Sequence, residues 1–442
     1  MRLSKAIEIS RGDVVSIVGA GGKTTAMFRL AHELASDGWR VVTTTTTMIR
    51  REERGEHTIL EPGQGRLLRK ARAALKTENH ITLVSGFREA EGKLTGVEPS
   101  LVDELISLPE VDAVIVEADG AKGRSLKAPA AHEPVISSST TILVPVVGVD
   151  ALRRKLDDTV AHRPEIVARL ADIQPGQVIT PEIVSKVVVH PEGGLKDAPP
   201  HARVIPLINK VTVAEMQPAR DIAQLLLDEP RVQRVILAAV AEEDPVKEAW
   251  ERVAAVVLAA GESRRFGSPK QLLPWKPTTL LEHVVDTALA SSLGDVIVVL
   301  GHLAEKIRDL LRDRPIRLVI NHDWDKGLST SVSAGLGALP ASYEACLFLL
   351  ADQPNVTTEL INTILSTYRR TLAPIVAPAY QGRRGNPVLF SRSLFPELLT
   401  MEGDQGGREV ILRHRDEMET VEVEEEDVFL DIDTAADYDG AR

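Results

Sequence analysis

The sequence is poor in cysteine and in long apolar runs. Only one cysteine, Cys346, occurs among 442 residues, so a chain of this composition forms no internal disulfide and no cluster of thiolate metal ligands. No apolar run approaches the ~20 residues that a membrane-spanning helix needs. The first residues also lack the charged start and apolar stretch of a secretory leader. We therefore expect a cytoplasmic protein that makes no membrane contact.

Positive charge is also scarce. The chain has 52 Lys and Arg residues against 64 Asp and Glu residues, a formal net charge of -12 at pH 7. Nucleic acids and anionic membranes attract basic surfaces, so neither is expected as a partner, and basic loops must act locally on small molecules. The length predicts two or three domains.

The most informative stretch lies past the middle of the chain, where an apolar run enters a loop of small residues. Ala259, Ala260 and Gly261 allow backbone amides to approach a nucleotide. Arg265 and Lys270 follow within a few positions and can neutralise a triphosphate. The residues assigned to nucleotide binding here are Leu258, Ala259, Ala260, Gly261, Ser263 and Gly267.

The full spacing of residues 258–274, Leu-Ala-Ala-Gly-x-Ser-x-Arg-x-Gly-x-x-Lys-x-Leu-Leu-Pro, resembles the signature loop of the molybdenum cofactor nucleotidyltransferases. Its Ala-Ala-Gly form is similar to the cytidylyl (MocA-like) branch, whereas the guanylyl branch usually has Ala-Gly-Gly. The resemblance implies a Rossmann-like nucleotidyltransferase domain over residues 252–442. Its expected reaction transfers CMP from CTP to molybdopterin with Mg²⁺ and releases pyrophosphate.

One carboxylate stands out at the end of an apolar strand. Residues 346–351 are apolar throughout, as in a strand covered on both faces, and Asp352 follows them directly. We assign Asp352 to Mg²⁺ and Lys270 and Arg265 to the phosphates. The stretch Asp431-Ile432-Asp433-Thr434 resembles a family motif near the end of the fold. Asp433 is our candidate second ligand, although the residues alone leave the choice between Asp431 and Asp433 open.

Three further loops are candidates for contact with the pterin substrate. The Trp-x-x-Gly-Leu-x-x-Ser stretch around Gly327 is either a capped helix start or a ligand-facing loop. Residues 385–387 and 403–408 resemble family loops around the pterin, and the alternative is that they are plain turns. The residues assigned to this substrate are Gly327, Ser331, Gly385, Asn386, Pro387, Gly406 and Arg408.

A second strand, glycine loop and helix occur near the start of the chain. Apolar residues 14–18 precede the loop, and a helix is expected from about Thr24 to Ser36. Open amides, a lysine and a hydroxyl at a helix start form a phosphate cradle. Ile17 replaces the first glycine of a full Walker A motif, so the loop has the shorter form of Mur-ligase-type ATP sites; a structural turn is the alternative. The residues assigned to phosphate binding are Gly19, Gly21, Gly22, Lys23, Thr24 and Thr25.

Acidic residues follow the apolar residues 111–116. Glu117 and Asp119 come next, and Asp119 is our candidate metal ligand in this half. Residues 116–129 and His132-Glu133-Pro134 resemble the YqeC-type accessory family linked to selenium-dependent molybdenum hydroxylases, over roughly residues 10–240. The resemblance implies a hydroxylase apoenzyme as partner and leaves the reaction open.

Some features of the first half are less specific. The run Thr43–Thr47 is expected to form a strand with its hydroxyl groups on a wet face. Asn209-Lys210 invites comparison with a guanine-reading motif, but Thr212 replaces the required aspartate, so both ATP and GTP remain candidates. Residues 241–251 are expected to form a linker or a short helix.

The sequence thus predicts two α/β three-layer domains: a P-loop-like domain over residues 1–245 and a Rossmann-like domain with a mostly parallel sheet over residues 252–442. Two alternatives to molybdopterin cytidylylation remain. One is another nucleotidyltransferase of the sugar-phosphate or guanylyl type. The other is a mainly non-catalytic protein that delivers the cofactor.

Overall fold

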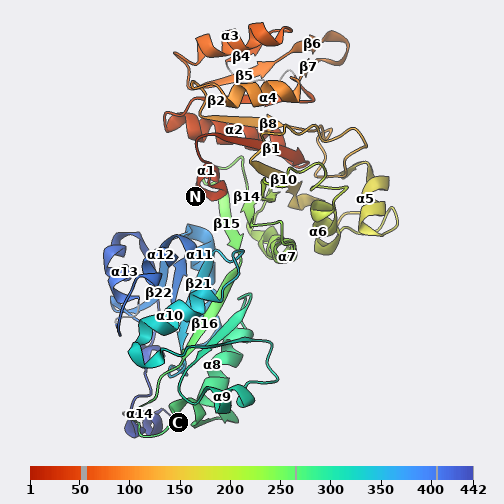
Figure 1. The fold of residues 1–442 in the computed structure, drawn as a ribbon. Helices are drawn as coiled ribbons and strands as arrows, with labels where there is room; N and C mark the ends of the chain where they lie inside the picture. Colours follow the sequence, from red (N-terminus) through yellow and green to blue (C-terminus); the bar gives the residue numbers. More distant parts are fainter. Residues whose placement is uncertain (51–56, 264–265, 405–406, 442) are drawn as a thin grey trace. The chain divides into compact units, whose positions relative to one another are not determined.

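The chain divides into two compact units, Met1–Trp250 and Glu251–Arg442, which we call the N-terminal and the C-terminal unit. The computed structural model describes residues 1–50, 57–263, 266–404 and 407–441. Both units are α/β with mostly parallel sheets, as predicted (Figure 1). In these described ranges, no helix has the length and apolar character needed to cross a bilayer.

A large sheet forms the centre of the N-terminal unit. Its strands follow the order β15-β14-β13-β10-β1-β8-β2-β5-β4, with β12 beside β10. The central strand β1 is parallel to β10 on one side and to β8 on the other. The strands are β1 (Asp13–Gly19), β2 (Val41–Thr45), β4 (Thr58–Leu60), β5 (His80–Val84), β8 (Ala113–Glu117), β10 (Ile142–Gly148), β12 (Arg203–Val204), β13 (Leu207–Asn209), β14 (Arg234–Ala238) and β15 (Val246–Glu251).

Helices cover both faces of this sheet, so the unit has three layers (Figure 1). One apolar core joins Val14 and Val18 of β1 to Leu101 of α4. Another joins Val147 of β10 to Ile222 of α7. The helices are α1 (Leu3–Ile7), α2 (Lys23–Ser36), α3 (Gln64–Ala74), α4 (Pro99–Ile106), α5 (Pro164–Ala171), α6 (Pro181–Val189) and α7 (Met216–Leu227). Two small sheets contain β3 (Met48–Arg50), β6 (Gly86–Arg88) and β7 (Lys93–Thr95), and β9 (Leu126–Lys127) with β11 (Ala161–His162).

The threonines of β2 are buried, which corrects the expectation of a wet face. Thr43 hydrogen-bonds the Thr82 hydroxyl at 2.8 Å, and Thr44 donates to the carbonyl oxygen of Leu83 at 2.8 Å. Thr45 donates to the carbonyl oxygen of Glu117 at 2.8 Å. A strand inside a parallel sheet is covered on both faces, so these hydroxyls find their partners on neighbouring strands rather than in water.

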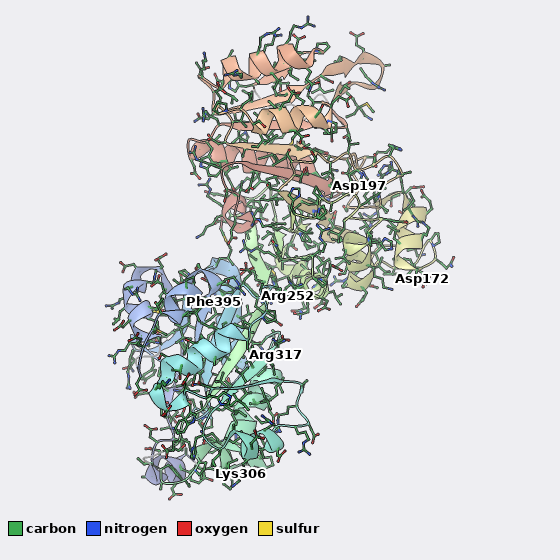
Figure 2. All side chains as sticks on the ribbon, in the orientation of Figure 1. Asp172, Asp197, Arg252, Lys306, Arg317 and Phe395 are labelled. Atoms are coloured by element: carbon green, nitrogen blue, oxygen red, sulfur yellow. The ribbon has the colours of Figure 1, made fainter. Side chains whose placement is uncertain are left out.

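Strand β15 occupies most of the segment that was expected to be a linker or short helix, so that expectation is wrong for residues 246–251. The charged residue Glu248 is only 2% exposed, because Arg220 binds it and the Trp250 ring nitrogen donates to it at 2.8 Å. Arg252 alone separates β15 from β16, the first strand of the C-terminal unit (Figure 2).

The sheet of the C-terminal unit follows the order β20-β19-β16-β21-β24-β22-β23, with β25 beside β22. Strands β20, β19, β16 and β21 are parallel, and β24 is antiparallel to β21 and β22. The strands are β16 (Val253–Ala259), β19 (Val296–Leu300), β20 (Arg317–Ile320), β21 (Ala345–Leu350), β22 (Ile375–Tyr380), β23 (Arg383–Arg384), β24 (Val388–Ser391) and β25 (Met418–Glu422). A short hairpin contains β17 (Pro274–Trp275) and β18 (Thr278–Thr279).

Strand β16 is buried along its whole length because alternate residues face two different cores. Ala255 and Val257 belong to a core with α8 and α11, whereas Val256 and Leu258 belong to one with α10, α12 and α13. The only cysteine of the sequence, Cys346, is fully buried beside them in β21. The helices are α8 (Leu280–Leu289), α9 (Ala304–Leu310), α10 (Leu328–Gly337), α11 (Thr358–Thr371), α12 (Phe395–Leu399), α13 (Arg408–Arg413) and α14 (Ala435–Gly440).

Candidate functional site

A pocket of about 780 Å³ opens at the carboxyl end of β16. The small residues Ala259, Ala260 and Gly261, at the end of β16 and just after it, leave this space open. A Cβ atom added to Gly261 would meet nothing within 4 Å. Several predicted site residues from separate loops therefore share one cavity. Those that line it are Leu258, Ala259, Ala260, Gly261, Ser263, Lys270, Gly327, Ser331, Asp352 and Asp433.

Lys270 is the electrostatic centre of this pocket. Its ammonium group contacts Asp352 and lies 3.1 Å from Oδ1 of Asp433. Burial alone would lower the pKa of Lys270, but Asp352 and Asp433 outweigh it and raise that pKa above its ordinary value. Lys270 is therefore charged across the physiological range.

A third carboxylate, Asp431, adds to the negative charge. Burial, together with the charges of Asp352 and Asp433, raises the pKa of Asp431, and Gln353 donates to it at 2.8 Å. No set of three or more His, Cys, Asp or Glu side chains forms a metal cage in the described ranges. Mg²⁺ is commonly held by one or two carboxylates plus substrate phosphates and water. The crowded carboxylates around Lys270 fit such an ion.

Gln271 fixes the loop from inside and was missed by the sequence interpretation. It is 3% exposed, and its amide donates to the carbonyl oxygens of Gly261 at 2.8 Å and of Ala259 at 3.2 Å. Ser263 accepts a hydrogen bond from the backbone N–H of Lys270 at 3.2 Å. The only signal in the sequence was a polar residue between Lys270 and two leucines.

An adjoining cavity of about 210 Å³ has a different character. Its lining is mostly apolar, but it includes Asn386 and two arginines, Arg384 and Arg408. Burial and the charge of Arg408 both lower the pKa of Arg384. Neither arginine forms an ion pair with a carboxylate in the described part of the chain. Arg384 was not predicted, and two adjacent guanidinium groups without a carboxylate suit an anionic ligand.

The remaining predicted residues of this unit have mainly packing contacts, and two lie outside the described residues. Gly327 packs so closely on Gly403 that an added Cβ would lie 2.5 Å from its carbonyl carbon, and Ser331 accepts from Asn321 at 3.0 Å. Gly385 has similar contact with the Phe429 ring. Pro387 is buried, and Gly267 lies in the loop before Lys270 without lining either cavity. The predicted residues Arg265 and Gly406 lie outside the described residues.

The glycine loop of the N-terminal unit lies against protein on several sides. An added Cβ would be 2.4 Å from the carbonyl oxygen of Val146 at Gly19, and 2.2 Å from the Gly148 nitrogen at Gly21. Gly22 is equally close to the amide of Asn209, at 2.3 Å. The loop borders a pocket of about 910 Å³ that is also lined by Lys23, Thr24 and Thr25.

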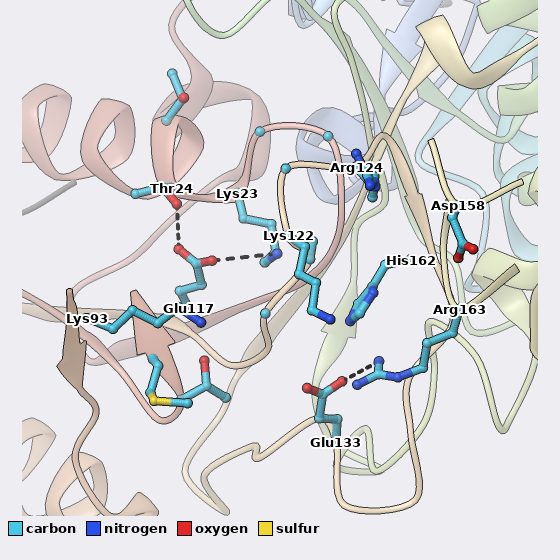
Figure 3. A pocket seen from close by; sticks show the side chains of 18 of the residues that line it. Lys23, Thr24, Lys93, Glu117, Lys122, Arg124, Glu133, Asp158, His162 and Arg163 are labelled. Atoms are coloured by element: carbon cyan, nitrogen blue, oxygen red, sulfur yellow. Dashed lines mark hydrogen bonds and ion pairs between the residues drawn. The ribbon is translucent and has the colours of Figure 1, made fainter. Parts of the chain in front are cut away.

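Lys23 lies inside this loop and is 4% exposed. Its ammonium group donates to the carbonyl oxygen of Gly19 at 2.9 Å and lies 3.4 Å from Asp119. It also lies 3.5 Å from Glu117 (Figure 3). Burial lowers the pKa of Lys23, but the two carboxylates raise it by more than burial lowers it, so the net shift is upward. Thr24 donates to Glu117 at 2.8 Å.

The two acidic residues of this site have different surroundings. Asp119 is 2% exposed; it accepts from the backbone N–H of Gly19 at 3.1 Å and pairs with Lys127 at 2.7 Å. Glu117 lines the pocket, whereas Asp119 does not. The assignment of a metal to Asp119 remains a prediction. Glu117 and Thr24 both line the pocket, so they are better placed than Asp119 to contact a bound metal ion.

Asn209 supports the glycine loop. Its side chain donates to the carbonyl oxygen of Gly21 at 2.8 Å and accepts from the backbone N–H of Val240 at 3.0 Å. Both ends of the amide are thus bonded to backbone, and the residue is 3% exposed.

Comparisons with known proteins agree with this two-part organisation. Residues 15–165 match the family described as YqeC protein, and residues 255–418 match the family described as MobA-like NTP transferase domain. The C-terminal unit is thus an α/β domain of the nucleotidyltransferase superfamily. The chain belongs to the YqeC family through its N-terminal unit and to the MobA-like NTP transferase family through its C-terminal unit.

Three relatives illustrate the range of functions. The uncharacterized protein YqeC of Escherichia coli K12 is 31% identical over 210 residues, which are 46% of this chain and 78% of that protein. The nicotine blue oxidoreductase of Paenarthrobacter nicotinovorans is 33% identical over 192 residues, 41% of this chain and 92% of the relative. The molybdenum cofactor cytidylyltransferase of E. coli K12 is 28% identical over 188 residues, 42% of this chain and 94% of the relative.

Proposed function

We propose that the C-terminal unit transfers CMP from CTP to the terminal phosphate of molybdopterin and releases pyrophosphate. The observation that carries this proposal is the convergence of Lys270, Asp352 and Asp433 in one pocket beside the Ala259–Gly261 backbone. This arrangement combines a cation for phosphate oxygens with carboxylates for a metal ion. Family membership and a cytidylyltransferase relative support the same reaction.

The residues act mainly by orientation and charge. The molybdopterin phosphate is already ionised near pH 7, so no general base is required. Lys270 holds phosphate oxygens of the nucleotide, and the small loop residues leave their backbone amides open to it. Holding the attacking oxygen in line with the α-phosphorus accounts for much of the rate. Arg265 is assigned to the same phosphates from the family pattern.

Asp352 and Asp433 would hold Mg²⁺, with Asp431 as the third carboxylate nearby. When bound, this ion supplies positive charge against the α-phosphate and pyrophosphate oxygens. Lys270 contacts both aspartates, so its single positive charge offsets part of their negative charge before substrate arrives.

In this proposal the nucleotide occupies the larger cavity and the acceptor the smaller one, and Leu258 lines both cavities. The methyl groups of Ala259 and Ala260 narrow the base site toward a pyrimidine. Asn386, Arg408 and the newly found Arg384 form the acceptor side, and the two arginines suit an anionic group of the cofactor. Gly385, Pro387 and Gly406 are assigned to shaping this side, whereas Gly327 and Ser331, also assigned to the pterin substrate, line the larger cavity.

An oxidoreductase is the specific alternative, because the oxidoreductase relative shares more identity than the cytidylyltransferase relative. The lysine and its two carboxylates favour transfer, since hydride transfer does not need a metal-holding pair beside a phosphate-binding lysine. Pyrophosphate release should be measured with CTP, GTP and ATP in the presence of molybdopterin and Mg²⁺. We expect release with CTP above all. Equal use of GTP would remove the cytidylyl assignment, and consumption of NADH or NADPH without pyrophosphate release would favour the oxidoreductase.

For the N-terminal unit we propose binding of ATP or GTP at Gly19–Thr25, with Mg²⁺ between Thr24 and Glu117, in the maturation of a molybdenum hydroxylase. The start of α2, where no side chain caps Gly22, and the buried Lys23 support this proposal. Lys23→Ala should weaken nucleotide binding roughly ten- to a hundredfold and leave pyrophosphate release unchanged. Unaltered calorimetric binding in the variant would reduce the loop to a structural turn.

A further inference from the structure

The pocket beside the glycine loop has a second wall that phosphate binding by that loop does not use. Its volume of about 910 Å³ is near the upper end of ordinary ligand pockets, roughly 300 to 1,000 Å³. The basic side chains that line it away from the loop include Lys122, Arg124, His162 and Arg163, which lie together (Figure 3). We call these four residues the cationic wall.

The backbone of this wall is fixed to the glycine loop. The N–H of Gly21 donates to the carbonyl oxygen of Arg124 at 2.9 Å. Strand β9 then pairs with β11, which sets Lys127 beside His162. Arg163 donates to the carbonyl oxygen of Ala128 at 3.3 Å. The wall therefore has a defined position relative to the phosphate loop.

The half-buried Glu133 does not neutralise the whole wall. Glu133 pairs with Lys127 and with Arg163, each at 2.8 Å, and these cations lower the pKa of Glu133 to about 2 against the opposing effect of burial. The negative charge of Glu133 is therefore already balanced by Lys127 and Arg163 and does not offset the charges of Lys122 and Arg124. Asp158 and Glu165 also line the pocket, but both are exposed to water, which weakens their field.

Lys122 and Arg124 remain without a partner among the described residues. Neither side chain forms a hydrogen bond or ion pair with any residue in the described part of the chain, and Arg124 is half-buried. A partly desolvated guanidinium group without an acceptor is unfavourable unless a ligand supplies one.

The pKa of His162 reflects the positive charge of the cationic wall. Burial, followed by the charges of Arg163, Lys127 and Lys122, lowers the pKa of His162 to about 4, and Glu133 opposes this shift only partly. The imidazole is therefore neutral at pH 7. An anion bound beside it would stabilise the protonated form and raise its pKa.

We propose that the cationic wall is an oxyanion subsite that binds the phosphate or carboxylate group of a small molecule facing the glycine loop. The proposal rests on the proposed function only where it places a nucleotide at that loop. The oxyanion then has two sources: the terminal phosphate of that nucleotide, or a separate anionic substrate. In either case Lys122 and Arg124 neutralise it. If the source is a separate substrate, the N-terminal unit does more than hold a nucleotide.

Inorganic phosphate tests this subsite on the full-length protein by calorimetry. Arg124→Gln should weaken phosphate binding roughly tenfold or more without changing the melting temperature, because the side chain has no protein partner to lose. Arg69→Gln, the same charge change on the exposed face of α3, should leave binding unaltered. Equal phosphate affinity in the wild type and Arg124→Gln would overturn the proposal.

Two further measurements distinguish the two sources of the oxyanion and test whether a nucleotide binds at the glycine loop. With saturating non-hydrolysable ATP or GTP analogue, loss of phosphate binding identifies the nucleotide's terminal phosphate, and retained binding identifies a separate substrate. If neither analogue binds but phosphate still depends on Arg124, the nucleotide proposal fails and the subsite stands. Phosphate should also raise the pKa of His162 in histidine NMR spectra, assigned with His162→Gln. An unchanged pKa would contradict an anion at the wall.

Discussion

The two loops that follow the central strands use the same charge pattern in different surroundings. Lys23 and Lys270 each contact two carboxylates. At Gly21 an added Cβ would collide with the Gly148 backbone, whereas at Gly261 it would meet nothing within 4 Å. Protein packing itself therefore requires glycine in the first loop. In the second, the missing side chain leaves open space at the edge of the pocket.

The largest expected effect separates the two lysine sites by activity. Asp352→Asn keeps the side chain's shape but removes the charge that would hold Mg²⁺, so pyrophosphate release should fall by a factor on the order of 10² to 10³. CTP binding without metal should change much less. Near wild-type release by this variant at saturating Mg²⁺ and molybdopterin would refute the metal role.

The second prediction concerns the charge network of the N-terminal unit. The folded-state pKa of Glu133 is lowered from 4.5 to about 2, so this carboxylate stabilises the fold above pH 4.5 and loses that contribution as the pH falls toward 2. At about 1.36 kcal/mol per pKa unit, Glu133→Gln should cost about 3 kcal/mol at pH 7.

Urea unfolding at a series of pH values measures this effect. The stability gap between the wild type and Glu133→Gln should narrow steadily from pH 5 to pH 3. A gap that stays constant over this interval would mean that the residue acts through packing rather than charge.

The third prediction tests the contrast between the glycines directly. Gly21→Ala should lower the free energy of unfolding by about 2 to 4 kcal/mol, because Gly21 has a φ of 88° and lacks room for a methyl group. Gly261→Ala should change stability by less than about 0.5 kcal/mol and weaken CTP binding instead. Similar stability losses in both variants would contradict the conclusion that packing requires glycine at Gly21 but not at Gly261.

The smallest effect concerns independence of the units. A fragment of residues 251–442 should fold and retain transferase activity, because it contains the whole compact unit. It begins at Glu251 because this residue accepts a hydrogen bond from the Tyr368 hydroxyl at 2.5 Å. A fragment of residues 252–442 lacks this partner and should be less stable by about 1 to 2 kcal/mol. Thermal unfolding of both fragments compares them, and a fragment 251–442 that is insoluble would argue against independent folding.

The sequence predicted the elements that local pattern determines. The apolar run of β16 and its loop motif located Lys270, and the apolar strand before Asp352 placed that acid at the same edge of the sheet. Gln271 and Arg384 were missed because sequence does not reveal the direction in which a polar loop residue points. Strand β15 was missed because the partner that buries Glu248, Arg220, lies 28 residues away and is recognised only in three dimensions.

The single cysteine gives the molecule an internal reporter. Cys346 is fully buried in β21, and burial raises the pKa of its thiol, so the reactive thiolate is suppressed in the native state. A thiol-reactive dye can therefore label the chain only when the C-terminal unit opens. Labelling kinetics would then follow the opening of that unit alone, whatever the N-terminal unit is doing, and a bound nucleotide should slow them.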